Sequence, residues 1–355
     1  MDNLIQRTDV RSGPAAQKPP RLGFLGTGWI GRHRMQAILA ETEATAVAIA
    51  DPSPDMAQEA LKLAPEARIV SDLDGLLEQD LDAVVIATPS AQHAQQSIAA
   101  LEAGLAVFCQ KPLGRNAAEA SAVVEAARKA DRLLGVDFSY RQTQALRALR
   151  DLVRNGDLGN VFTADMVFHN AYGPDKDWFY DKSRSGGGCV MDLGVHLIDA
   201  ALWLLDFPDV SHVSSHLFAG GVPLDPAGGA VEDYAVATLT LDSGAAVRIA
   251  CSWRLQAGCD AVIGASLFGT GGGASMANVG GSFYDFTLER FAGTSRQTLI
   301  SPPDDWGGRA AAAWAAKLQV NRSYDPACER LLPVSEVIDR IYNHVPRKGD
   351  DHAQP

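Results

Sequence analysis

Short, continuous apolar runs alternate with alanine-rich stretches over roughly the first 140 residues of the chain. Continuous runs, in contrast to runs in which every second residue is polar, are typical of parallel strands buried on both faces. The stretches between them, such as "AQHAQQSIAALEAG" and "NAAEASAVVEAARKAD", have a helix-forming composition. The pattern therefore predicts an α/β domain over residues 21–140 with a doubly wound parallel sheet. The predicted strands are "RLGFLG", "ATAVAIAD", "ARIV", "DAVVIATP", "AVFCQKP" and "LLGVDF".

The pattern changes after Tyr140. An amphipathic helix is predicted at "TQALRALRDLVRNGDLG" and a second helix at "MDLGVHLIDAALWLLD". Beyond them, "AAVRIACSWR" alternates apolar and polar residues, which indicates a strand with two different faces. We therefore expect a C-terminal α/β domain over residues 141–345, built on a mostly antiparallel open sheet. Disordered tails are expected at residues 1–20 and 346–355.

Length and composition narrow the class of protein. A chain of 355 residues exceeds the usual size of one hydrophobic core, which agrees with two domains. The net charge of -12 and the lack of a Lys/Arg block argue against a nucleic-acid partner, and no apolar run approaches the roughly 18 residues of a membrane span. The five scattered cysteines lack metal-binding spacing, so reduced thiols are expected. The charge instead favours a small-molecule partner. Because residues 1–20 lack the apolar core of a secretory signal, we expect a cytoplasmic protein.

The segment "GTGWIG" follows the first predicted strand and precedes a helix-competent stretch. Gly26 permits a tight turn, Gly28 lets backbone amides approach a pyrophosphate, and Gly31 allows close packing of helix on strand. Asp51, at the end of the second strand, is placed to accept hydrogen bonds from the adenosine ribose. A plain strand-to-helix turn is the alternative, but the whole context favours a Rossmann dinucleotide site. The acid favours NAD because it would repel the 2'-phosphate of NADP, although the nearby Ser53 leaves NADP possible.

The ends of the fourth and fifth predicted strands, "ATPSAQH" and "CQKPLG", lie at the same sheet edge as the glycine loop. Ligands of open α/β folds collect at this edge. His93 is expected either to flank the nicotinamide or to be an exposed residue at a helix start. The predicted cofactor-binding residues are Gly26, Thr27, Gly28, Trp29, Ile30, Gly31, Asp51, Thr88, Pro89, His93, Gln110 and Lys111.

Lys111, Asp192 and His196 are the candidate catalytic residues. Lys111 follows the fifth strand, so its amine can reach a substrate that lies on the nicotinamide. Asp192 and His196 are four residues apart in a predicted helix and share one face, where the carboxylate can orient the imidazole. The alternatives are a solvated lysine and a core histidine on an apolar helix. No metal site is expected, because no further His or Cys ligands cluster with this pair.

Four motifs, "GTGWIGRH", "ATPSAQH", "QKPLG" and "GGGCVMDLGVHLID", occur in this order between about residues 21 and 206. Through them the sequence resembles the Gfo/Idh/MocA oxidoreductases, relatives of glucose-fructose oxidoreductase and inositol dehydrogenase. The match continues more loosely to "YDPACERLLPVSEVIDRIY". Where the family usually has glutamate before the lysine, this chain has Gln110, which removes a negative charge beside the amine.

The resemblance implies that Lys111, Asp192 and His196 bracket the hydroxyl group that is oxidised. His196 would take the hydroxyl proton, Lys111 would hydrogen-bond the same oxygen and share the proton transfer, and Asp192 would orient substrate and histidine. The segment "FHNAYGPDKDWFYDKSRSGGG" precedes these helix residues and is rich in polar and aromatic groups, although an ordinary surface loop could have this composition. The residues expected to bind a polyhydroxylated substrate are Arg141, His169, Asn170, Tyr172, Trp178 and Arg184.

The implied function is that of an NAD(P)-dependent oxidoreductase. It would transfer a hydride between nicotinamide and a secondary alcohol of a sugar, cyclitol or related small molecule. Two alternatives stay open: a redox-neutral enzyme that uses a transient oxidation for elimination or epimerisation, and a nucleotide-binding regulatory protein without turnover. Since the second-domain sheet of the resembling family commonly makes subunit contacts, a homodimer or homotetramer is expected.

Overall fold

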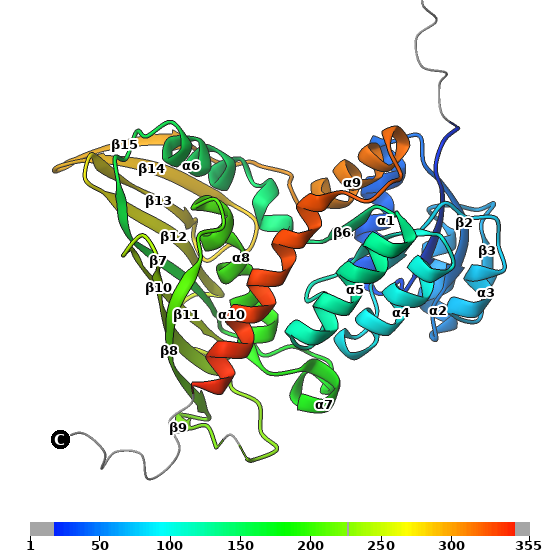
Figure 1. Ribbon diagram of the computed structural model, residues 1–355, viewed down its shortest axis with the longest axis horizontal. Helices are drawn as coiled ribbons and strands as arrows, with labels where there is room; N and C mark the ends of the chain where they lie inside the picture. The colour runs from blue at the N-terminus through cyan, green and yellow to red at the C-terminus, as the bar shows by residue number, and fades with distance from the viewer. Residues whose placement is uncertain (1–17, 226, 345–355) are drawn as a thin grey trace, which may run out of the picture.

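The six apolar runs of the N-terminal part form one parallel sheet in the order β3-β2-β1-β4-β5-β6 (Figure 1). The computed structural model describes residues 18–225 and 227–344 of the chain. The strand order reverses between β1 and β4, which is the point where open α/β sheets bind ligands. The predicted doubly wound parallel sheet is confirmed. Its strands are β1 Arg21–Leu25, β2 Thr45–Ala50, β3 Arg68–Val70, β4 Ala83–Ile86, β5 Ala106–Cys109 and β6 Leu134–Val136.

Helices connect these strands and cover both faces of the sheet, so that each face has its own apolar core. Side-chain caps begin two of the helices: Ser53 accepts a hydrogen bond from the Met56 amide, and Asn116 accepts one from the Glu119 amide. Such caps satisfy backbone N–H groups that have no partner inside the helix. The helices of this domain are α1 Trp29–Glu41, α2 Pro54–Leu61, α3 Leu73–Leu77, α4 Ser90–Glu102 and α5 Ala117–Ala130.

A second sheet of nine strands has the order β15-β14-β13-β12-β7-β11-β10-β8-β9. Every neighbouring pair is antiparallel except β11 and β7, so the prediction of a mostly antiparallel sheet is confirmed. Buried and partly exposed residues alternate along β10, as they do on a sheet with one covered face. The strands are β7 Val161–Asn170, β8 Val210–Ala219, β9 Val222–Pro223, β10 Tyr234–Leu241, β11 Ala246–Ser252, β12 Ala261–Gly269, β13 Gly272–Asn278, β14 Phe286–Ala292 and β15 Ser295–Ile300.

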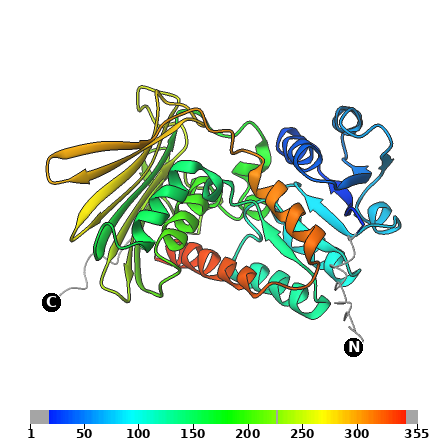
Figure 2. The ribbon, with the colours of Figure 1, turned by 90° about the horizontal axis from the view of Figure 1, so that it is seen from above.

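Three helices pack against one face of this sheet: α6 Gln144–Arg154, α8 Val195–Leu204 and α10 Leu332–Asn343. Figure 2 shows α10, in red, lying alongside α5 as well, so it joins the two domains. Shorter helical turns lie in the connections: η1 Ser139–Gln142, η2 Asp177–Tyr180, α7 Lys182–Ser185, η3 Val190–Gly194 and η4 Pro326–Leu331.

One helix of the predicted second domain packs with the first. In α9 (Arg309–Val320), Trp314 lies against Phe108 of β5 with ring centroids 5.4 Å apart. Ala311, Ala315 and Leu318 also belong to the N-terminal core. The predicted range 141–345 therefore does not form one packing unit, because the apolar face of α9 completes the first domain.

The predicted tails, residues 1–20 and 346–355, lie outside the described residues except for 18–20. Pro20 is buried and its carbonyl accepts a hydrogen bond from the Thr45 amide, so the first domain begins slightly earlier than predicted. The stretch Lys182–Leu204 is long and apolar enough to span a membrane, contrary to the sequence expectation, but 89% of its apolar window is buried in the protein. This stretch is a core element that carries Asp192 and His196.

Candidate active site

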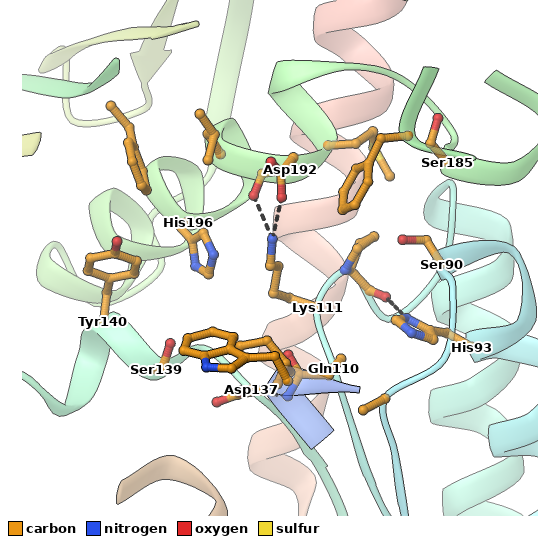
Figure 3. A pocket seen from close by; sticks show the side chains of 18 of the residues that line it. Ser90, His93, Gln110, Lys111, Asp137, Ser139, Tyr140, Ser185, Asp192 and His196 are labelled. Atoms are coloured by element: carbon orange, nitrogen blue, oxygen red, sulfur yellow. Dashed lines mark hydrogen bonds and ion pairs between the residues drawn. The ribbon is translucent and has the colours of Figure 1, made fainter. Parts of the chain in front are cut away.

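A cavity of about 430 Å³ lies between the two domains. On one side it is lined by residues that follow β1, β4, β5 and β6, which all end at the same edge of the parallel sheet. On the other side it is lined by the segment that leads into α8, by residues of the loops before it, and by Phe283, Tyr284, Trp306 and Gly307. Figure 3 shows that Lys111, Asp192 and His196 converge in this cavity. The structure therefore brings all three predicted catalytic residues together.

The glycine loop has the shape that a dinucleotide requires. A Cβ on Gly31 would lie 2.1 Å from the Gly26 carbonyl oxygen, so the first turn of α1 needs glycine there to approach the strand. Gly26 has a φ of +81°. At Gly28 an added Cβ would meet nothing within 4 Å, so this glycine leaves open space beside the first turn of α1. A helix N-terminus with free space beside it fits a pyrophosphate.

Asp51 directly follows β2 and is tied to this loop. One carboxylate oxygen accepts a hydrogen bond of 2.6 Å from the Thr27 amide, and the other accepts one of 2.8 Å from the Ser53 amide. The first oxygen also accepts a 3.2 Å bond from the Thr27 hydroxyl, so the oxygen that accepts from Ser53 has more acceptor capacity left for a ribose hydroxyl. Of the predicted cofactor residues, those that also line the cavity are Trp29, Ile30, Thr88, His93, Gln110 and Lys111.

Lys111 and Asp192 form an ion pair of 2.8 Å in which both side chains are less than one-fifth exposed. The Lys111 ammonium donates to an Asp192 side-chain oxygen and, at 2.7 Å, to the Asp192 backbone carbonyl. The second Asp192 oxygen accepts a 3.1 Å bond from the indole N–H of Trp253. One of the three ammonium hydrogens is thus left for a ligand. The prediction that Asp192 orients the histidine is wrong, because the Asp192 oxygens accept from Lys111 and Trp253 and the buried Nδ1 of His196 has no partner among the described residues.

His196 is a buried, neutral imidazole beside Lys111. Burial lowers its pKa well below 6.5, and the positive charges of Lys111 and Arg34 lower it further. Its Nδ1 is buried and has no hydrogen-bond partner within the described part of the chain. Because Nδ1 is closed off, Nε2 is the nitrogen through which this ring can accept a proton from a ligand. The helix widens into a π turn at Val190–Gly194, so His196 and Asp192 line the cavity without contacting each other as an α-helical pair.

Gln110 belongs to a buried polar cluster that sequence reasoning missed. Its amide donates a 2.6 Å bond to Asp137, which also accepts a 2.6 Å bond from Arg34. The Arg34 and Asp137 side chains are 7% and 1% exposed, so the charge pair is almost entirely inside the protein. Gln110 thus donates to a carboxylate whose charge is already balanced by Arg34. An aspartate within the apolar segment "LLGVDF" was the available signal.

His93 lines the cavity, as its first interpretation requires, and is not the exposed helix-start residue of the alternative. It is 1% exposed, and its ring nitrogens lie 2.7 Å from the carbonyl oxygens of Pro112 and Thr88. Burial lowers its pKa. The ring therefore joins the loop after β4 to the loop after β5, with both nitrogens engaged by the protein.

Only two of the six predicted substrate residues, Asn170 and Trp178, line the cavity. Arg141 instead forms an ion pair with the buried Asp199, and His169 hydrogen-bonds Ser252 at 2.7 Å. The Tyr172 hydroxyl donates to Asp260, and Arg184 is exposed at the surface. These four side chains are engaged or placed elsewhere. The cavity residues that were missed include five aromatic ones from "SYR", "DWFY", "SFYDF" and "DDWGG": Tyr140, Phe179, Phe283, Tyr284 and Trp306.

Glu232 fixes the start of the segment that carries Asp192. Its buried carboxylate accepts bonds from the Gly188 amide at 3.0 Å, the Val190 amide at 2.9 Å and the Tyr342 hydroxyl at 2.8 Å. Burial raises the pKa of this carboxyl. A Cβ on Gly188 would lie 1.9 Å from the Glu232 carbonyl oxygen, so the close approach requires glycine. The sequence contained no motif that pointed to this glutamate.

Across residues 18–225 and 227–344, no group of three or more His, Cys, Asp or Glu side chains is placed to hold a metal ion. The five cysteines are free thiols.

Comparison with known proteins gives consistent matches. The chain matches a family model described as an oxidoreductase family with an NAD-binding Rossmann fold over residues 21–138, and the GFO/IDH/MocA C-terminal domain over residues 146–275. It is 28% identical to D-glucoside 3-dehydrogenase of Escherichia coli K12 over 270 residues, which cover 73% of this chain and 77% of the relative. It is 33% identical to dTDP-3,4-didehydro-2,6-dideoxy-alpha-D-glucose 3-reductase of Saccharopolyspora spinosa, covering 61% and 67%. Levoglucosan dehydrogenase in complex with NADH and levoglucosan has a similar fold, with a TM-score of 0.79, 21% identity, and 92% and 97% of the two chains covered.

Proposed function

The chain belongs to the GFO/IDH/MocA family of oxidoreductases and binds NAD, and from this premise we propose that it oxidises a secondary alcohol of a sugar, cyclitol or related small molecule, or catalyses the reverse reduction. One observation carries the proposal: the Lys111–Asp192 ion pair and the neutral His196 line one cavity at the carboxyl edge of the dinucleotide-binding sheet. An alcohol held in this cavity would meet a hydrogen-bond donor and a proton acceptor together.

The Gly26–Gly31 loop and Asp51 would hold the pyrophosphate and the adenosine ribose, and Thr88 and Gln110 would border the nicotinamide. When bound, the nicotinamide supplies a carbon that accepts or returns a hydride. This assignment of the cofactor residues follows from the positions of the loop and of the strand ends.

His196 and Lys111 have separate tasks at the reacting oxygen. His196 accepts the hydroxyl proton at Nε2, which requires the neutral ring that burial and nearby positive charge favour. The free hydrogen of the Lys111 ammonium donates to the same oxygen and stabilises the negative charge that develops there. Asp192 holds that ammonium in place from two sides, through its carboxylate and its backbone carbonyl.

Replacing His196 with Ala tests this assignment. Because general base catalysis contributes roughly 10²- to 10⁴-fold, kcat should fall by about that factor while the Kd for NAD⁺ stays within about twofold. The measurement is formation of reduced nicotinamide, followed by absorbance, with a panel of cyclitols and sugars. An unchanged kcat in the variant would remove His196 from the mechanism. Product formation without net reduction of NAD⁺ would favour the redox-neutral alternative.

We also infer that the protein works in the cytoplasm as a homodimer or homotetramer. Within residues 18–225 and 227–344, helices cover one face of the nine-stranded sheet, and the other face carries the half-buried side chains Val236, Thr238 and Val262 (Figure 1). An uncovered sheet face of this kind supports pairing with a second copy. A monomeric mass in light scattering would contradict the inference.

A further inference from the structure

The cavity wall contributed by the second domain is aromatic beyond its catalytic residues. Six aromatic side chains line it: Phe168, Trp178, Phe179, Phe283, Tyr284 and Trp306. Aromatic rings supply large apolar contact areas and stack on other flat groups. The arrangement of these rings relative to Asp192 and His196 indicates what kind of molecule they contact.

One row of rings begins at Asp192. Trp253 donates its indole N–H to an Asp192 oxygen and meets Phe179 edge-on, with centroids 6.2 Å apart and planes at 88°. Phe179 then stacks on Trp178, with centroids 3.8 Å apart and planes at 22°. Aromatic surface thus continues from the catalytic carboxylate along one side of the cavity.

A second row begins at His196. Tyr140 meets the imidazole at 4.9 Å and an angle of 67°, and Trp306 lies 4.9 Å from Tyr140. Tyr284 follows at 6.1 Å from Trp306 and is 51% exposed, so this row reaches the surface. Trp306 donates its N–H to the Tyr284 carbonyl at 2.9 Å, and therefore offers the cavity an apolar ring.

Two polar side chains on the same side have hydrogen-bond partners within the protein. The side-chain oxygen of Asn170 accepts from the Tyr172 amide at 3.0 Å, and the Ser185 hydroxyl donates to the Asp181 carbonyl at 3.0 Å. Ligand hydroxyls placed against the ring faces of Phe179 and Trp306 would find no hydrogen-bond partner there, which weakens binding. The cavity suits a ligand that is polar at the catalytic residues and apolar away from them.

We propose that the substrate is a glycoside with an aromatic aglycone, a conclusion that rests on the proposed oxidation at this site. A sugar hydroxyl gives its proton to His196, the hydride on the same carbon passes to NAD⁺, and the products are a keto-glycoside and NADH. The glycosidic bond stays intact. The aglycone lies between the row that begins at Trp253 and the row that begins at Tyr140.

The test compares matched pairs of substrates that differ only in the aglycone. Phenyl and methyl β-D-glucopyranoside, with the corresponding galactosides and xylosides, are assayed with the full-length protein and NAD⁺. Within the pair that is oxidised, kcat/KM for the phenyl glycoside should exceed that for the methyl glycoside by about 10- to 100-fold, since an added apolar group fills an apolar pocket. If no pair is oxidised, the dissociation constants of the phenyl and methyl glycosides from the NADH complex are compared instead. The phenyl glycoside should then bind about 10- to 100-fold more tightly than the methyl glycoside.

Phe179→Ala and Trp306→Ala should each reduce the phenyl-to-methyl ratio toward one, because each removes part of an aromatic row. Phe162→Ala is the matched control, since Phe162 is an exposed aromatic on β7 that is not among the residues lining the cavity. It should leave the ratio unchanged.

Equal values for phenyl and methyl glycosides, or a preference for free sugars and inositols, would overturn the aromatic-aglycone inference while leaving the proposed dehydrogenase intact. A loss of preference in Phe162→Ala equal to that in Phe179→Ala would also overturn it. Failure of the proposed function is a different result, namely tight binding of NAD⁺ with no oxidation of any alcohol.

Discussion

His196 stays neutral because its surroundings oppose the charged form of the ring. Burial removes water from the imidazole, and Lys111 and Arg34 add positive charge nearby. The residue that would accept the hydroxyl proton is therefore ready to do so at neutral pH.

The pH dependence of oxidation follows from this lowered pKa. Protonated His196 cannot act as a base, and its pKa lies well below 6.5, so kcat/KM should be constant from about pH 6.5 to 8 and should fall only as the pH drops through that lowered value. Initial rates of NAD⁺ reduction across this range measure the profile. An acidic limb centred at or above 6.5 would show that the ring is not held neutral.

Asp51 should control cofactor affinity and choice. Asp51→Ala removes the acceptor for the ribose and the hydrogen-bond partner of the Thr27 amide, so the Kd for NAD⁺ should rise about tenfold and the preference for NAD⁺ over NADP⁺ should shrink. Binding titrations with both nucleotides measure this. The matched control is Asp55→Ala, which removes an exposed carboxylate in the first turn of α2. If Asp51→Ala and Asp55→Ala raise the Kd for NAD⁺ equally, the effect comes from the loss of one negative charge and not from the hydrogen bonds of Asp51.

For single residues, the sequence predicted that Lys111, Asp192 and His196 lie in one site, but it did not predict their hydrogen-bond partners. Lys111, Asp192 and His196 could be found because they follow a strand end or share a helix, which are local patterns. The bond from Asp192 to Trp253 could not be found, because it joins a π turn to a residue 61 positions later. Arg141 was misassigned for the same reason, since its partner Asp199 is far away in sequence.

Among the elements, the segment from Gly188 to Gly194 determines where the catalytic carboxylate lies. Glu232 holds its first amides, and Tyr342 of α10 donates to the same carboxylate. A helix that begins inside the protein leaves N–H groups that need acceptors, and a buried glutamate supplies them here. Glu232 is thus a positioning residue that acts on Lys111 through Asp192.

Glu232→Gln should separate positioning from cofactor binding. The amide retains one acceptor oxygen and places an NH₂ group against a backbone N–H, so the free energy of unfolding should fall by about 1 to 3 kcal/mol and kcat by about tenfold, with the KM for NAD⁺ unchanged. Urea denaturation and initial rates measure the two effects. Tyr342→Phe leaves both backbone hydrogen bonds to Glu232 in place, so it should lower the free energy of unfolding and kcat by less than Glu232→Gln does. A destabilised Glu232→Gln variant with wild-type kcat would show that the glutamate has only a structural role.

Elements were predictable where a repeating pattern defined them. Six continuous apolar runs became six parallel strands, and the alternation in "AAVRIACSWR" became β11. The packing of α9 was not predictable, because an alanine-rich apolar face does not specify which core it joins. Its contact with Phe108 depends on the chain returning to the first domain after β15.

At the scale of the whole molecule, the two domains meet along one cavity. Helices α9 and α10 both return to the first domain from the second, so the strand ends of one face the α8 region of the other (Figure 1). The aromatic rows come from chain segments around residues 140, 178, 253, 284 and 306, which share no spacing or motif. For this reason the fold class could be predicted from sequence while most of the substrate side of the site could not.

The central claim is that nicotinamide, Lys111 and His196 meet in this cavity. A crystal structure of the protein with NAD⁺ and a bound alcohol tests it most directly. The account predicts a carbinol carbon about 3 to 3.5 Å from nicotinamide C4, with its oxygen within hydrogen-bond distance of the Lys111 ammonium and of His196 Nε2. A nicotinamide ring bound outside the cavity, or an alcohol oxygen that contacts neither side chain, would contradict it.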